Sequence, residues 1–229
     1  TDYGPGAMDS EGTTTASLLV DPGSARVYLR LWDMSNSNNP QIDSTTQLNI
    51  SYYGNANSVS LSLSDSVVAV GTDYNDEVRL VDISDTFNPI VRSSIVADVD
   101  AVEVVGDRLY VLTPTLLSVY KISDLDAPAL LGTLAGSFTK ALDIVGNQMY
   151  IGNTSDQLQI FDVSNPASIT PLGDFTTPVS PDAVDVEGDL AAVGAANTMI
   201  MLDVSDPSSP VELGNAENPE NLLKLIVDG

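Results

Sequence analysis

A repeat of about forty-one residues is the feature that most constrains the fold of this 229-residue chain. Five segments share an apolar run, a charged residue, an apolar residue and a serine, and the serines stand at Ser35, Ser84, Ser123, Ser164 and Ser205. Successive serines lie 49, 39, 41 and 41 residues apart, so the period is nearly constant after the first unit. Fixed periods of this size are typical of proteins built from repeated supersecondary units.

A second landmark recurs with the same period. The segments 101–106, 141–146, 183–188 and 224–229 are each an apolar-rich run that ends in glycine. After the three internal glycines comes Asp or Asn and then another apolar run, which favours a tight hairpin. One unit therefore reads as strand, tight turn, strand, short loop, strand, proline-containing turn and strand.

Four short strands in about forty residues are typical of one blade of a β-propeller. We expect an all-β, five-bladed propeller of four-stranded antiparallel blades. Helical repeats are disfavoured because the apolar runs are short, alternate with polar residues and are rich in β-branched residues. A parallel β-helix, with coils of about 20 residues, is the competing architecture, but it does not use hairpin-type turns.

The predicted domains are a flexible N-terminal arm, residues 1–14, and a single propeller domain, residues 15–229. The expected blades are 15–50 together with 222–229, 58–97, 100–135, 139–175 and 182–214. The first blade is stitched from both ends of the chain because residues 1–14 are polar and the end of the chain has a spare apolar strand. That strand closes the ring or pairs with a neighbouring subunit, because an exposed apolar edge favours aggregation. Its apolar residues are Leu222, Leu223, Leu225, Ile226 and Val227.

The recurring strand that ends in Asp82 or Asp162, followed by Val or Ile, Ser and a proline-containing turn, resembles the LVIVD-repeat family of bacterial and archaeal surface proteins. The resemblance covers about residues 15–229. It implies a propeller at the cell surface, generally without an assigned reaction. Lys121 replaces the aspartate of the repeat in the third unit, and the first unit is eight to ten residues longer than the others.

Net charge restricts the partners of the chain. The sequence has 32 acidic and 8 basic residues, which gives a formal charge of −24. Nucleic acids and anionic membranes are therefore poor partners, and no apolar run is long enough to span a bilayer. An acidic surface suits a saline or extracellular setting, where salt screens the repulsion. We expect a secreted, mature protein that is extracellular or on the cell surface, and the sequons at Asn49 and Asn153 agree with this address.

The residue types also restrict the chemistry. The chain has no cysteine and no histidine, which removes thiol catalysis and the commonest general base and zinc ligand. Trp32 is the only tryptophan, and the acidic residues repeat regularly instead of forming an unlike pair, so glycoside hydrolysis is disfavoured. We expect no enzymatic activity and no obligatory cofactor.

Polar residues of the innermost strands are the best candidates for a binding site. Aligning the units on their glycines brings one residue of each unit to the same level, and Lys224 lies one level away. If these side chains face the axis, three carboxylates converge, and water, raised pKa values or a bound cation such as calcium relieves their repulsion. The predicted polar ring of the central channel consists of Ser62, Glu103, Asp143, Asp185 and Lys224.

The aspartates of the repeat itself are expected to be structural. They occupy equivalent places in separate blades, so they lie far apart around the ring. An aspartate at the end of a strand accepts backbone N–H bonds within the following turn. These turn aspartates are Asp33, Asp82, Asp162 and Asp203.

Two functions remain open from the sequence. The first is a structural or adhesive module that associates with itself or with other surface proteins, in a filament or an array. The second is a propeller that binds a carbohydrate or calcium at one face, with a glycoside hydrolase as its least favoured form.

Overall fold

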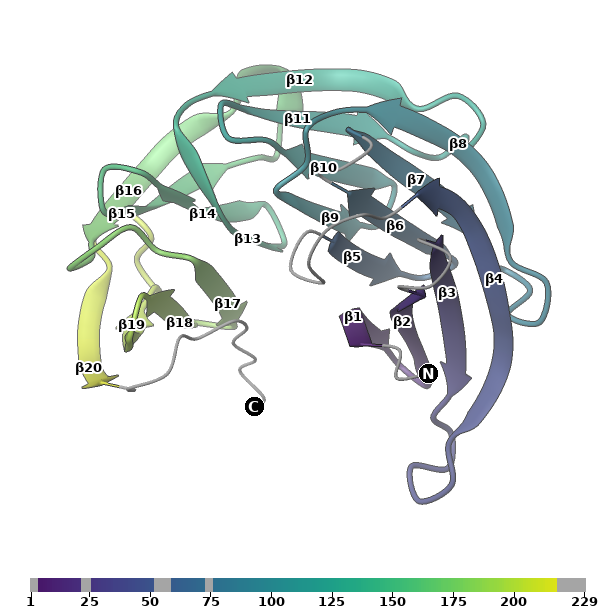
Figure 1. Cartoon of the computed structure of the whole chain (residues 1–229). Coiled ribbons are helices and arrows are strands. Elements are labelled where there is room, and N and C mark those ends of the chain that lie inside the picture. The colour runs from purple at the N-terminus through teal and green to yellow at the C-terminus, as the bar shows by residue number, and fades with distance from the viewer. Residues whose placement is uncertain (1–3, 22–25, 52–58, 73–75, 218–229) are drawn as a thin grey trace. The chain divides into compact units, whose positions relative to one another are not determined.

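The computed structural model describes residues 4–21, 26–51, 59–72 and 76–217, and their regular structure is almost entirely β (Figure 1). Their strands form five antiparallel sheets of four strands each. In these described ranges only η2 (Pro166–Ser168), a short 3-10 turn, is helical, and no helix there is long and apolar enough to cross a membrane. The predicted all-β class with four-stranded antiparallel units is confirmed.

Each sheet consists of four strands that are consecutive in the chain. The first sheet contains β1 (Gly4–Glu11), β2 (Thr14–Asp21), β3 (Arg26–Asp33) and β4 (Gln41–Ser51), and the second contains β5 (Val59–Ser64), β6 (Val67–Thr72), β7 (Glu77–Asp82) and β8 (Ile90–Val96). The third contains β9 (Ala101–Val105), β10 (Arg108–Leu112), β11 (Leu116–Lys121) and β12 (Ala129–Ala135). The fourth contains β13 (Phe138–Val145), β14 (Gln148–Asn153), β15 (Gln157–Asp162) and β16 (Thr170–Thr176), and the fifth contains β17 (Ala183–Glu187), β18 (Leu190–Ala195), β19 (Thr198–Asp203) and β20 (Val211–Glu217).

The chain divides into two compact units. The first unit comprises Thr1–Val111 and Tyr120–Leu130, and the second comprises Leu112–Val119 and Leu131–Gly229. In the first unit, the inner strands β1, β5 and β9 lie side by side, and in the second unit β13 lies beside β17. The third sheet supplies strands to both units. The single domain of residues 15–229 therefore stays a prediction.

The second strand of a sheet is buried on both faces. In β6, β14 and β18 the five residues after the first are all buried. Outer strands such as β8 instead alternate between exposed and half-buried residues. A strand covered on both faces reads as a continuous run of small and apolar residues, whereas a strand with one covered face alternates. A continuous run of small and apolar residues in the sequence thus shows which strand of a sheet is covered on both faces.

Residues in the left-handed backbone conformation form the tight turns between the first two strands of the sheets. Gly12, Gly106, Gly146 and Gly188 have φ values of 57°, 57°, 61° and 58°. At the same place in the second sheet is Asp65, with φ of 51°. Glycine adopts this conformation without steric cost, and aspartate tolerates it better than most residues. The recurring glycine of the sequence is therefore a backbone requirement of the hairpin.

Apolar residues from neighbouring sheets form the core of each unit. In the first unit, Leu29 and Leu31 of the first sheet belong to one buried cluster with Val68 of the second. In the second unit, Tyr150 of the fourth sheet belongs to a cluster with Val193 of the fifth. Full burial of such a side chain stabilises the fold by about 1.5–3 kcal/mol. One sheet alone has two apolar faces, so it needs its neighbours to cover them.

The prediction of a flexible arm at residues 1–14 is wrong for residues 4–11, which form β1 and pair with β2 in an antiparallel register. The segment from Ala7 to Gly12 shares its Ala, acidic, acidic and Gly positions with the segment from Ala183 to Gly188. Its polarity was misleading because acidic side chains are hydrogen-bond acceptors on an inner strand. Both the arm and the first-blade boundary at residue 15 are corrected by this strand.

The stitched first blade is also wrong. β1 already occupies the place beside β2 that residues 222–229 were expected to fill. The proposed closure or trans-pairing strand, with Leu222, Leu223, Leu225, Ile226 and Val227, lies outside the described residues. All five sheets have four strands without it.

Candidate functional site

One polar position recurs on the inner strands, three residues before each turn residue with positive φ. In the first unit it is Asp9 on β1, Ser62 on β5 and Glu103 on β9. In the second unit it is Asp143 on β13 and Asp185 on β17. Sequence reasoning found four of these residues and missed Asp9, although the motif from Ala7 to Gly12 was the signal for it. Lys224, the remaining member of the predicted ring, lies outside the described residues.

In the first unit these side chains link neighbouring inner strands. Asp9 Oδ2 accepts a hydrogen bond from the Leu63 N–H at 2.8 Å. Ser62 Oγ accepts one from the Val104 N–H at 2.9 Å and donates to Glu103 Oε1 at 3.4 Å. The structure therefore brings Ser62 and Glu103 together, as members of a contact between two sheets.

The second unit repeats this contact. Asp143 Oδ2 accepts a hydrogen bond from the Val186 N–H at 2.6 Å. As in the first unit, the donor is one residue beyond the position equivalent to the acceptor. We call this contact the inner-strand staple. An inner strand is the edge strand of its sheet, and a buried N–H without an acceptor is costly, so a side chain of the preceding sheet supplies the acceptor.

Burial makes Asp143 the most perturbed carboxyl of the inner strands. Its pKa is raised to about 6, chiefly by desolvation and further by the charge of Asp185, while the hydrogen bond from the Val186 N–H acts in the opposite direction. The pKa of Tyr150 is also raised, by burial and then by the charges of Asp143 and Asp189. Asp143 and Asp185 are thus close enough for their charges to interact.

The inner-strand carboxylates do not gather into a metal cage in the part of the chain that the structure describes. No group of three Asp or Glu side chains there is placed to hold a cation. Each calcium ion in a protein takes six to eight oxygen ligands, of which several are usually carboxylates. The geometry of these residues suits hydrogen bonding between sheets.

The turn aspartates act within their own turns. Each accepts a hydrogen bond from the N–H of the serine two residues later: Asp33 from Ser35, Asp82 from Ser84, Asp162 from Ser164 and Asp203 from Ser205, at 2.8–3.0 Å. These bonds lower the pKa of all four carboxyls. The serine N–H is the largest cause except at Asp203, where the Ser205 hydroxyl comes first. The aspartate of the repeat is a cap for its turn.

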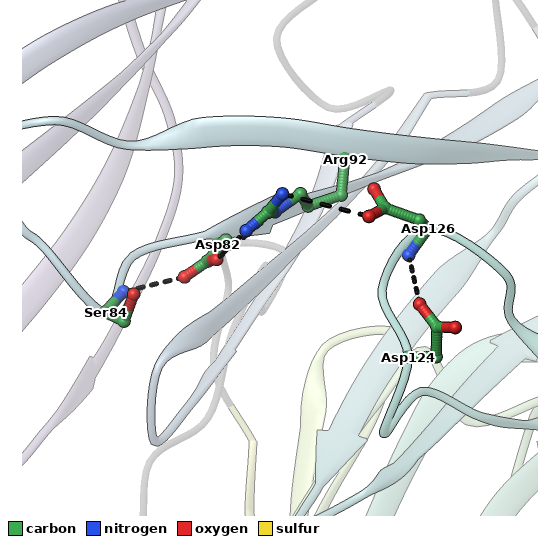
Figure 2. A network of polar contacts seen from close by, with 5 residues as sticks. All are labelled: Asp82, Ser84, Arg92, Asp124 and Asp126. Atoms are coloured by element: carbon green, nitrogen blue, oxygen red, sulfur yellow. Dashed lines mark hydrogen bonds and ion pairs between the residues drawn. The ribbon is translucent and has the colours of Figure 1, made fainter.

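Asp82 has an additional partner that joins the second sheet to the third (Figure 2). The guanidinium of Arg92, on β8, donates to Asp82 Oδ2 at 2.8 and 3.2 Å and lies 3.8 Å from a carboxylate oxygen of Asp126. Asp126 in turn donates its N–H to Asp124 Oδ1 at 3.1 Å. The Ser84 N–H and Arg92 together lower the pKa of Asp82 to about 2. Figure 2 therefore shows a bridge between two turns.

Small residues of the outer strands form a further contact between sheets that sequence reasoning missed. A Cβ built on Gly132 of β12 would lie 1.8 Å from the Pro166 carbonyl oxygen, and one on Gly173 of β16 would lie 2.3 Å from the Pro207 carbonyl oxygen. In the first unit, Ser93 of β8 donates its hydroxyl proton to the Leu125 carbonyl at 2.5 Å. The outer strands β8, β12 and β16 thus each receive the serine–proline turn of the next sheet. The signal was the small residue that recurs in the last strand of each unit.

Trp32 lies on the face of β3 that is turned away from the buried leucines of that strand. Its Nε1–H donates to Ser17 Oγ at 3.0 Å, and the guanidinium of Arg30 lies 5.5 Å from the centre of the ring. An arginine over an indole ring is a favourable cation–π contact. Trp32 and Arg30 therefore order one another on the half-buried face of the first sheet.

The second sequon is engaged in local structure. Asn153 is only 8% exposed, and its Oδ1 accepts hydrogen bonds from the N–H groups of Ser155 and Gln157. Its Nδ2 donates to Gln157 Oε1 at 3.0 Å. A glycan on this nitrogen would break that hydrogen bond and need space around a buried side chain. The side chain of Asn49 is outside the described set.

Comparison with solved structures shows the same fold in proteins of distant sequence. A functionally unknown protein from Desulfotomaculum acetoxidans DSM 771 aligns with 100% of this chain and 73% of its own, with a TM-score of 0.73 and 14% identity. The computationally designed Ika8 protein aligns with 93% of this chain and 63% of its own, with a TM-score of 0.62 and 15% identity. A chain of the mitotic checkpoint complex aligns with 97% of this chain and 70% of its own, with a TM-score of 0.70 and 10% identity. The chain thus spans less than two thirds of the designed protein, and the similarity is one of fold alone.

Family comparison is more specific than these structural matches. No curated protein matches the chain. The model of the LVIVD repeat matches residues 137–177 and 181–217. These two ranges contain the fourth and fifth sheets, with their inner-strand staple and two of the turn aspartates. The fourth and fifth sheets are therefore LVIVD repeats, as the resemblance of their sequences predicted.

Proposed function

We propose that this protein is a non-catalytic, five-bladed β-propeller that acts outside the cell or at the cell surface as a structural or adhesive module. The observation that carries the proposal is the use of its acidic residues. Asp9, Asp143 and the turn aspartates accept backbone N–H groups and so hold sheets and turns together. Carboxylates committed in this way stabilise a scaffold and are poorly placed to bind a substrate.

The propeller-like fold and the charge of the chain support the same function. Proteins made of repeated sheets present large surfaces, and their ligands are bound by surface residues that differ between members of a family. The formal charge of −24 keeps such a surface away from nucleic acids and anionic lipids. A saline extracellular medium screens the repulsion within the surface.

Self-association is the form of this function that the sequence favours. Each of the five sheets is complete with four strands, yet residues 224–229 repeat the inner-strand pattern for a sixth time. A strand of this kind offers an edge to a second copy of the chain through main-chain hydrogen bonds. We propose that this edge joins neighbouring copies in an assembly.

Sedimentation velocity over a range of concentrations tests the proposal. We expect the wild-type chain to form oligomers at high concentration. The substitution Ile226→Pro removes an N–H from the pairing edge and should leave a folded monomer. The control is Ile90→Pro at the first residue of β8, a strand position where proline is better tolerated. A wild-type chain that stays monomeric at every concentration, or assembly that survives Ile226→Pro, would refute self-association.

A further inference from the structure

The inner-strand staple of the first unit includes a proton donor. Ser62 Oγ accepts a hydrogen bond from the Val104 N–H at 2.9 Å and donates its own proton to Glu103 Oε1 at 3.4 Å. A hydroxyl can make both bonds because it is an acceptor and a donor at once. One side chain of β5 therefore makes two hydrogen bonds to β9.

In the second unit a carboxyl group takes the place of this hydroxyl. Asp143 stands at the position of Ser62, three residues before a turn residue with positive φ, and its Oδ2 accepts the Val186 N–H at 2.6 Å. Asp185 of β17 stands at the position of Glu103. An ionised carboxylate is an acceptor only, so Asp143 needs a proton before it can donate a hydrogen bond to Asp185.

The neighbouring strands bring no positive charge to Asp143. In the register of β13 and β14, Asp143 is opposite Tyr150, whose hydroxyl donates to Gln148 Oε1 at 2.7 Å. From β17, the charge of Asp185 raises the pKa of Asp143. The charge of Asp189, in the turn after β17, raises the pKa of Tyr150. The neighbouring charges that act on Asp143 and Tyr150 are thus negative.

Basic side chains are scarce in the fourth and fifth sheets. Lys140 is the only lysine or arginine in residues 138–217, and its side chain is exposed near the start of β13. Glu187, further along β17, is acidic and exposed. In the second sheet, by contrast, Arg92 donates to Asp82 and helps to keep it ionised. A proton can relieve a repulsion between carboxylates that no arginine of these two sheets offsets.

We infer that Asp143 and Asp185 share one proton between the fourth and fifth sheets, and that this proton is the equivalent of the hydroxyl hydrogen of Ser62. Protonated Asp143 keeps the Val186 N–H on its carboxyl group and donates its own O–H to Asp185. Two hydrogen bonds then join β13 to β17. Loss of the proton breaks the second bond and leaves two negative charges facing one another.

The pKa of Asp143, raised to about 6, sets the pH at which this contact changes. Because this value is above the ordinary 3.8, the contribution to stability is complete below pH 3.8 and is lost as the pH rises through about 6. Acid therefore strengthens the contact between the two sheets. The device lies within one chain and does not depend on self-association.

Carbon-13 NMR of the aspartate carboxyl groups, followed from pH 3 to pH 8, tests the shared proton. We expect the carboxyl carbons of Asp143 and Asp185 to report the same titration step near pH 6, because a shared proton belongs to the pair. Asp185→Asn should lower the midpoint of Asp143 by about one pH unit or more, since it removes a like charge. The control Asp189→Asn removes an exposed charge from the same sheet and should leave this midpoint unchanged.

Two results of this titration would overturn the inference. The first is a carboxyl carbon of Asp185 that shows no step near pH 6. The second is a midpoint of Asp143 that is the same in Asp185→Asn and in wild type. Either result would show that burial alone keeps the proton on Asp143.

Asp143→Ser supplies an independent test, because it introduces the side chain that the first unit uses. Its hydroxyl should accept the Val186 N–H and donate to Asp185 at every pH, so its urea midpoint should change less between pH 5 and pH 7 than that of wild type. Asp143→Ala lacks both bonds and should unfold at a lower urea concentration than Asp143→Ser at both pH values. A serine variant that is no more stable than the alanine variant, or as dependent on pH as wild type, would contradict the equivalence with Ser62.

Discussion

Aspartate side chains lie in two opposite electrostatic environments in this fold. At Asp82, a turn N–H and the Arg92 guanidinium stabilise the carboxylate and lower its pKa to about 2. At Asp143, burial on an inner strand and the charge of Asp185 outweigh the N–H donors of Val186 and Ile144, and the pKa rises to about 6. Asp82 loses little hydration and gains a cationic partner, whereas Asp143 gives up water for backbone hydrogen bonds alone. Burial therefore decides the direction of the shift.

The raised pKa of Asp143 predicts a specific dependence of stability on pH. Between its ordinary value of 3.8 and about 6, the folded state binds more protons at this site than the unfolded state, so the contribution of Asp143 to stability falls as pH rises through this window and is level above it. Asp143→Asn keeps an acceptor for the Val186 N–H and has no charge to bury. We expect the Asp143 contribution to this fall in stability to be absent from the variant. At pH 7 the free energy of unfolding of the variant should exceed that of wild type by about 1–3 kcal/mol.

Urea unfolding at pH 4.5 and at pH 7 measures this effect. Asp98→Asn is the matched control, because that side chain is exposed in a loop and should leave the difference between the two pH values unchanged. A difference in Asp143→Asn equal to that of wild type would show that the carboxyl of Asp143 titrates normally.

At the scale of strands and sheets, neighbouring sheets within a unit are joined at two places, along their inner strands and along their outer strands. Inner strands are joined by the staple, in which a side chain of one sheet accepts an N–H of the next. Outer strands are joined by a small residue that receives the following turn, as Gly173 receives Pro207. Between these contacts lies the apolar packing of the middle strands. The residue types that recur from repeat to repeat are therefore those that contact the neighbouring sheet.

Glycine at the outer position is a steric requirement wherever a turn docks. In Gly132→Ala the new methyl group would overlap the Pro166 carbonyl oxygen, which belongs to the backbone and cannot rotate away. We expect a loss of about 1–3 kcal/mol of unfolding free energy, measured by chemical denaturation. Gly214→Ala is the control, since no described atom lies within 4 Å of a Cβ placed there, and it should be neutral or slightly stabilising. Equal losses in the two variants would place the effect in the strand itself.

For the whole molecule, the formal charge of −24 is distributed over a scaffold with only 8 basic residues. The ion pairs that the structure describes, such as that of Arg92 with Asp82, offset a small part of this charge. Repulsion among the remaining carboxylates opposes the compact state, and its range shortens as ionic strength increases. The stability of the fold is thus coupled to the salt content of its surroundings.

Thermal unfolding should therefore shift upward with added salt. We expect NaCl to raise the Tm, and each kcal/mol of relieved repulsion corresponds to about 2–4 °C for a chain of this size. CaCl₂ at the same ionic strength should give a similar shift if the effect is screening, and a distinctly larger one if calcium binds specifically. A Tm that does not respond to NaCl would show that the carboxylates are neutralised within the fold.

Several features of this protein follow from its sequence alone. The period of the serines and glycines predicts five units of four strands, because turns need residues with particular backbone freedom and strands need alternating apolar residues. The turn aspartates were recognised for the same local reason, since their acceptor oxygen and donor N–H are two residues apart. The LVIVD resemblance depends on these local patterns and was confirmed by the matched repeats.

Only the tertiary structure decided how one sheet contacts the next within a unit. It made β1 an inner strand because Asp9 accepts the Leu63 N–H from a neighbouring sheet, a contact across fifty-four residues that no local pattern contains. It also showed that Ser62 and Asp143, two of the residues predicted for a polar ring, accept N–H groups of the next sheet, and that the pKa of Asp143 is raised. Local sequence determines the hydrogen bonds within a hairpin, but partners far apart in the chain are chosen by the packing of whole sheets.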